Sequence, residues 1–262
     1  MYMIFNRIAK SHFLFLLLGA SVTGTSDAKT SIEKITAECR SFASQISTDK
    51  TLGSASVRAN LLQKHSSQCK GIGTYDSSLA ALFQQAGLYD EADRVAYAGM
   101  PTANEFRPNL LNVLALNQLG RGNVDKAYQM GLEIARQFPK YAPIYGLLGQ
   151  IDSKLNRWDR AHQDAKKLIE LDPSALSFMA LATTLYQLKR YPEVLDAVNY
   201  ALKIEPQRIG NASGLTEGIY ALILLNRREE ATHLLTRHIN ANPNWRASVP
   251  MIKAAQELGL AQ

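Results

Sequence analysis

The chain has 262 residues, of which 46% are hydrophobic and 20% are charged. This balance is too apolar for wholesale disorder, and it suits one or two ordinary domains or one extended repeat array. The formal net charge of +6 is a modest excess, not the dense basic surface that is typical of a nucleic-acid-binding protein. The two cysteines, Cys39 and Cys69, do not form a closely spaced zinc-type pair.

Residues 1–28 have the pattern of a secretory signal peptide. Arg7 and Lys10 precede an apolar run at 13–22, which is shorter than the roughly 20 residues that a membrane-spanning helix needs. Small residues follow, and the small-x-small rule places the cleavage near Ala28. The sequence therefore predicts an exported chain, periplasmic or secreted, with no membrane span in the mature part. The alternative is that the apolar run is retained as a membrane anchor.

Residues 29–72 predict an N-terminal helical cap. Apolar side chains at helical spacing after Ser31 indicate one helix, and a second is expected to begin near Ser54 or Ser56, after a loop around Gly53.

The two cysteines lie in this cap. In an exported chain a Cys39–Cys69 disulfide is the preferred interpretation, because these are the only thiols. The bond requires the second helix to end near Ser66, so that Cys69 can turn back towards the first helix. A metal site made by Cys39, His65 and Cys69 is the alternative.

Residues 73–245 repeat one pattern five times. A small residue opens the second helical segment of each unit, and these residues recur at intervals of 35, 34, 33 and 37 residues: Ala92, Ala127, Ala161, Val194 and Ala231. Closing prolines follow four of these segments, where a helix must end: Pro139, Pro173, Pro206 and Pro243. Such periods, each with two helical segments, predict an all-α solenoid of stacked antiparallel helix pairs.

The first and fifth units depart from the pattern. The first breaks early at Gly99, and the fifth has Gly218-Ile219 where a large residue followed by a small one is expected. We therefore expect these two pairs to be bent or loosely packed. Residues 246–262 predict a C-terminal capping helix with Pro250 in its first turn, where proline is tolerated.

The stretch from Gly149 to Pro173, with Trp158, Ala161 and Ala165, resembles the tetratricopeptide repeat family, and the resemblance covers residues 73–245. It implies a right-handed superhelix whose first helices line a concave groove for a partner peptide or helix. The groove positions that it implies are Leu116, Leu119, Gln150, Ser153, Met179, Thr183, Tyr186, Thr216, Tyr220 and Ile223. The alternative is that Met179, Tyr186 and Ile223 pack between neighbouring helices.

A row of basic residues is expected along the tips of the helix pairs: Arg121, Arg157, Lys189, Arg190, Arg227 and Arg228. Acidic residues follow closely in the sequence: Asp125, Asp159, Glu193, Glu229 and Glu230. The row is therefore either a set of salt-compensated helix tips or a basic edge for an acidic or peptidoglycan-like partner.

The sequence contains no nucleotide-binding loop, nucleophile elbow or zinc-protease motif. It therefore predicts no catalytic site, no cofactor and no metal. The expected function is that of a non-catalytic scaffold or adaptor that binds a protein or peptide in the cell envelope. The alternatives are a membrane-anchored subunit of an envelope complex and a carbohydrate- or peptidoglycan-binding module that uses Trp158, Tyr186 and Tyr220.

Overall fold

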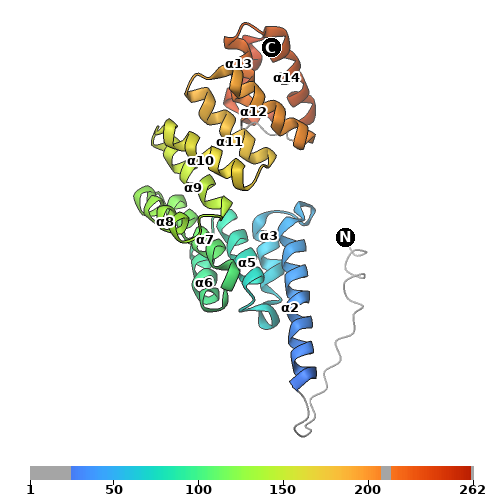
Figure 1. Ribbon diagram of the computed structural model, residues 1–262. Coiled ribbons are helices and arrows are strands. Elements are labelled where there is room, and N and C mark those ends of the chain that lie inside the picture. The colour runs from blue at the N-terminus through green and yellow to red at the C-terminus, as the bar shows by residue number, and fades with distance from the viewer. Residues whose placement is uncertain (1–24, 208–213, 261–262) are drawn as a thin grey trace.

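The computed structural model describes residues 25–207 and 214–260. Within these ranges it has fourteen α-helices and no β-strand, which confirms the all-α fold class (Figure 1). Most of the expected signal peptide, residues 1–24, lies outside the described residues. Among the described residues, none of the helices combines the length and the hydrophobicity that a bilayer-spanning helix requires.

The N-terminal cap consists of α2 (Thr25–Thr48), the 3₁₀ turn η1 (Lys50–Leu52), α3 (Ala55–Gln63) and the short α4 (Ser66–Cys69). The helix α2 begins before the expected start at Ser31 and continues through Ala28, because no proline or glycine interrupts this segment. The Ser54 side chain caps α3 by accepting a hydrogen bond from the Val57 N–H, as N-cap serines do.

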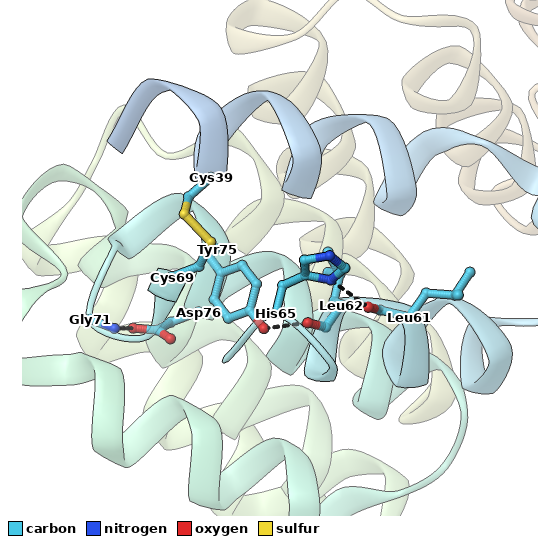
Figure 2. Close-up of a disulfide and its surroundings, with 8 residues drawn as sticks. All are labelled: Cys39, Leu61, Leu62, His65, Cys69, Gly71, Tyr75 and Asp76. Carbon is cyan, nitrogen blue, oxygen red and sulfur yellow. Dashed lines mark hydrogen bonds between the residues drawn. A yellow bond between two sulfur atoms is a disulfide. The ribbon is translucent and has the colours of Figure 1, made fainter. Parts of the chain in front are cut away.

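A disulfide joins Cys39 of α2 to Cys69 of α4, with 5.5 Å between the two Cα atoms (Figure 2). The turn back is sharper than expected, because α3 already ends at Gln63 and α4 returns the chain to α2. Both sulfur atoms are bonded, so the alternative of a metal site with Cys39, His65 and Cys69 is wrong. The His65 ring instead packs on Phe42, with 4.3 Å between ring centroids.

Five helix pairs follow the cap. They are α5 (Gly73–Gln85) with α6 (Tyr89–Gly99), α7 (Arg107–Gly120) with α8 (Val124–Gln137), α9 (Ala142–Lys154) with α10 (Trp158–Leu171), α11 (Ala175–Gln187) with α12 (Tyr191–Ile204), and α13 (Leu215–Leu224) with α14 (Arg228–Ala241). The five small residues that define the period are all 0% exposed, so they allow the helices of neighbouring layers to approach closely.

The pairs stack into a curved solenoid (Figure 1). First helices of successive pairs contact one another, whereas each second helix contacts mainly its own partner and the first helix of the next pair. The first helices α5, α7, α9, α11 and α13 therefore form the inner layer of the curve, and the second helices form the outer layer.

The turn inside each pair has one residue in the left-handed region, with φ between 56° and 83°: Gly87, Gly122, Asn156, Lys189 and Asn226. The N–H of the next residue donates to the carbonyl five residues earlier over 2.8–2.9 Å in all five turns. This hydrogen bond gives a partner to a carbonyl group at the C-terminal end of the first helix, which has none within the helix. The left-handed conformation itself favours glycine or asparagine.

The two irregular pairs differ in packing: the helices of the first pair contact each other extensively, whereas those of the fifth pair contact each other less than in the other pairs. The helix α6 ends at Gly99, and the turns η2 (Met100–Thr102) and η3 (Asn104–Phe106) lead to α7. In the fifth pair Leu215 and Ile219 are 0% exposed, and Gly218 lies against Val198 of α12. The glycine replaces a large side chain where two helices touch, so the departure from the pattern produces a close contact.

The C-terminal cap is α15 (Val249–Glu257), with Pro250 in its first turn as predicted. The 3₁₀ turn η5 (Trp245–Ala247) precedes it and was not foreseen from the sequence. Met251 and Ala254 of α15 are 0% exposed and join the core of the fourth and fifth pairs. The helix therefore covers the apolar end of the stack.

Candidate partner-binding groove

A cavity of about 390 Å³ opens between the inner-layer helices α9 and α11, with α10 as its floor. Its lining residues are Tyr145, Gly146, Gly149, Gln150, Ser153, Lys154, Ala161, Ala165, Leu168, Ala180, Thr183 and Thr184. Most of these side chains are small, and Gly146 and Gly149 have none. The cavity exists because small residues fill these positions of the repeat.

Three of the predicted groove residues meet in this cavity: Gln150 and Ser153 from α9, and Thr183 from α11. Gln150 is exposed, and the other two are half-buried. For these three residues, the position that the resemblance implied coincides with the cavity lining.

The remaining predicted groove residues lie elsewhere. Met179 is 2% exposed in the C-terminal core, and Tyr186 and Ile223 pack against that core, as the alternative interpretation proposed. Leu119 is buried and Leu116 half-buried in the core around α7 to α9. Packing inside the stack is thus the main role that the structure gives these side chains.

Thr216 and Tyr220 lie on α13, at the C-terminal end of the inner layer, and both are half-buried. The Tyr220 hydroxyl donates a hydrogen bond to the Pro250 carbonyl over 3.2 Å and so ties α13 to α15. Trp158, the third aromatic residue of the carbohydrate-binding alternative, is half-buried at the start of α10, which is an outer-layer helix.

Two acidic residues that sequence reasoning missed each contact a residue of the cavity lining, although neither lines the cavity itself. Asp164 of α10 lies behind Gly149, where a Cβ atom would be 3.5 Å from the Asp164 Cβ. The Thr183 hydroxyl donates to Glu217 Oε1 over 3.3 Å. Burial raises the pKa of Asp164 to about 7, with Asp152 as a second cause, and burial also raises the pKa of Glu217.

One signal in the sequence could have indicated Asp164. It lies three residues after Ala161 and four before Leu168, which are spacings of the inward face of α10. Glu217 gave no such signal, because it reaches Thr183 across a contact between two helix pairs.

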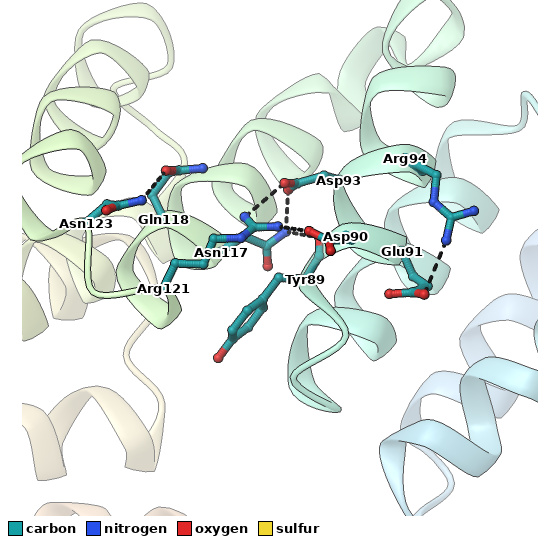
Figure 3. A network of polar contacts seen from close by, with 9 residues as sticks. All are labelled: Tyr89, Asp90, Glu91, Asp93, Arg94, Asn117, Gln118, Arg121 and Asn123. Carbon is teal, nitrogen blue, oxygen red and sulfur yellow. Dashed lines mark hydrogen bonds and ion pairs between the residues drawn. The ribbon is translucent and has the colours of Figure 1, made fainter.

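At the start of the basic edge, Arg121 contacts the preceding helix pair (Figure 3). Its guanidinium group lies 2.7 Å from Asp90 Oδ1 and 2.9 Å from Asp93 Oδ2, and it covers the Tyr89 ring at 5.5 Å. The buried Asn117 side chain donates to Asp93 Oδ1 over 2.6 Å. The expected neighbour Asp125 takes no part in this network, because Arg121 contacts acidic residues of the preceding helix pair instead.

The other arginines of this edge also have acceptors. Arg157 forms an ion pair with Asp152, and Arg228 donates a hydrogen bond to the Glu257 carbonyl. Neither acceptor is among the acidic residues that we expected to compensate this edge. Arg190 binds Glu193 and Arg227 binds Glu230 within one helix turn. Lys189 is exposed in the left-handed turn position. This arrangement favours the interpretation of salt-compensated helix tips.

Comparison with known proteins shows which proteins share this fold. No protein-family model and no curated protein matches the sequence. Among solved structures, YrrB, a TPR protein with an unusual peptide-binding site, is 14% identical with a TM-score of 0.52, and the match covers 76% of this chain and 99% of that one.

Two further structures are more similar. PilF of Pseudomonas aeruginosa has a TM-score of 0.61 at 18% identity, over 85% of this chain and 99% of that one. TTC0263, a TPR protein of Thermus thermophilus, has a TM-score of 0.58 at 18% identity, over 72% of this chain and 99% of that one. At these identities the likeness shows the fold, and the chain has the fold of tetratricopeptide repeat proteins.

Proposed function

We propose that the chain is a non-catalytic scaffold or adaptor that binds a segment of another protein along its inner face. The observation that supports this most is the cavity between α9 and α11, where Gln150, Ser153 and Thr183 provide polar groups over an apolar floor. Its volume of about 390 Å³ lies within the range of protein ligand sites. Stacked helix repeats commonly use such extended concave surfaces for binding.

Tyrosine substitutions at Ser153 and at Gln163 test this function. Ser153→Tyr places a ring in the cavity, whereas Gln163→Tyr changes an exposed position of α10 that does not line it. The native chain, used as bait in an extract of its own cells, should retain a partner that Gln163→Tyr also retains and Ser153→Tyr loses. Equal retention by both variants would show that the cavity is not the binding site. Substitutions of Tyr186 or Tyr220 are less suitable, because both residues pack in the stack.

We also propose that the chain is exported to the periplasm or secreted. Residues 1–28 have a signal-peptide pattern, and a disulfide such as Cys39–Cys69 persists outside the reducing cytosol. The intact mass of the chain purified from its native compartment should lack about 28 N-terminal residues. A mass that includes Met1, in a membrane fraction, would contradict this and support the membrane-anchored alternative.

A further inference from the structure

The N-terminal half of α2 extends beyond the other helices of the cap (Figure 1). Between Ser31 and Glu38 every side chain is exposed except that of Thr36, which is half-buried. Burial begins at Cys39 and continues at Ala43, where α2 packs on the rest of the cap. A helical segment of this length is marginal in water on its own, so a packing partner would stabilise this half of α2.

Two exposed isoleucines lie on this segment, about one turn apart. Ile32 is 65% exposed and Ile35 is 39% exposed, and a spacing of three residues puts them on the same side of the helix. Ile35 also lines a cavity of about 270 Å³ between α2 and the chain around α4. The other residues of the cavity lining are Glu38, Cys39, Phe42, His65, Gln68 and Cys69. We call this continuous surface, from Ile32 to the cavity, the α2 face.

The charges of the segment match those of a second copy that runs in the opposite direction. Glu33 and Lys34 are adjacent, and counting outward from the point between them sets Ile32 against Ile35, and the lysine of position 29 against Glu38. An antiparallel copy centred on this point therefore brings each charge level with an opposite charge and each isoleucine level with an isoleucine. A parallel copy in register would bring like charges level instead.

The charged side chains are available for such a contact. In the described part of the chain, neither Glu33, Lys34 nor Glu38 forms an ion pair. The two lysines and two glutamates of positions 29–38 cancel in charge, so the segment lacks the basic face of a helix that lies on an anionic membrane. The match of signs about one centre instead favours a second copy of the same helix.

We infer that two copies of the mature chain associate through their α2 faces, with the two helices antiparallel and Ile32 of each copy at the cavity of the other. Such a contact uses the same surface of both copies, as two-fold symmetric dimers do. The groove between α9 and α11 lies on other helices, so the inference goes beyond the proposed function and does not depend on it. Because the contact is short, we expect a reversible dimer with a Kd of about 10–100 µM.

Sedimentation equilibrium of the mature chain, up to about 300 µM, measures this association. Ile32→Gln removes an apolar side chain from the contact in both copies and keeps a residue that favours helix, so it should raise the dimer Kd about tenfold or more. Leu132→Gln is the matched control, because Leu132 is 43% exposed on the outer-layer helix α8. It should leave the dimer Kd unchanged.

Cysteine crosslinking reports the direction of the helices. The two native cysteines are bonded to each other, so a single added cysteine is the one reactive thiol of the described residues. An antiparallel pair brings position 32 level with position 35 of the second copy. Oxidation of a mixture of Ile32→Cys and Ile35→Cys chains should therefore give about fivefold more crosslinked dimer than either variant alone.

Three outcomes would overturn the inference. The first is a native chain that stays monomeric over the whole concentration range. The second is an equal effect of Ile32→Gln and Leu132→Gln on the dimer Kd, which would place the contact elsewhere. The third is crosslinking of each cysteine variant alone as efficiently as in the mixture, which would indicate parallel helices.

Discussion

At the residue scale, Asp76 of α5 is a buried acidic group near the disulfide. It is 3% exposed, and its Oδ2 accepts a hydrogen bond from the Gly71 N–H over 2.9 Å (Figure 2). Gly99 allows this burial, because a Cβ there would lie 2.8 Å from Asp76. Burial raises the pKa of Asp76 to about 6, against the opposing effects of Gly71 and Lys70.

This shift predicts a pH-dependent stability. The folded pKa of about 6 is above the ordinary value of 3.8, so the contribution of Asp76 is fully present below pH 3.8 and is lost as the pH rises through about 6. Relative to Asp76→Asn, the native chain should lose about 1–2 kcal/mol of unfolding free energy between pH 4.5 and 7.5. Urea denaturation of both proteins at the two pH values measures this, and parallel pH profiles would contradict it.

Single residues were predictable from the sequence where their own repeat determines their place. The buried small residues from Ala92 to Ala231 follow from the period alone. The partners of Arg121 could not be predicted in this way, because Asp90 and Asp93 belong to the preceding pair and the sequence offered Asp125 as a nearer acid. Contacts between pairs depend on the angle between layers, which a one-dimensional period does not specify.

At the element scale, the five helix-pair turns share one backbone conformation although their sequences differ. Glycine or asparagine occupies the left-handed position in four turns, and Lys189 occupies it in the turn between α11 and α12. A lysine there has a Cβ atom that crowds the backbone in this region, whereas glycine has none.

Lys189→Gly should therefore stabilise the chain by about 0.5–1 kcal/mol, because relief of this strain exceeds the added freedom of the unfolded chain. The reverse change in the second pair, Gly122→Lys, should destabilise it by a similar amount. Thermal unfolding of both variants checks the pair of expectations. If Lys189→Gly lowered the melting temperature, the strain argument would be wrong.

The disulfide connects α2 to the rest of the cap, and its two cysteines are 30 residues apart in the sequence. In the chain-entropy model, reduction should cost about 3–4 kcal/mol. Because contacts in a solenoid are local, hydrogen exchange should accelerate in α2 to α4 and stay unchanged in α11 to α14. Equal acceleration in both regions would show that the stack unfolds as one unit.

At the scale of the whole molecule, the buried residues form three core clusters along the chain, one centred on the cap and first pair, one around α7 to α9, and one around the last pairs with α15. The repeat period predicted this stack. It did not predict the early start of α2, since polar residues there carry no apolar periodicity. It also did not identify the acidic residues Asp164 and Glu217, whose burial depends on how the helices of neighbouring pairs meet.

The central claim is that the inner face between α9 and α11 binds a protein segment. A photo-crosslinking residue at position 150, which is exposed and lines the cavity, tests it in cells, with position 163 on α10 as the control. The account predicts a crosslinked product of reproducible mass from position 150 and none from position 163. The same products from both positions, or no product from position 150, would contradict the account.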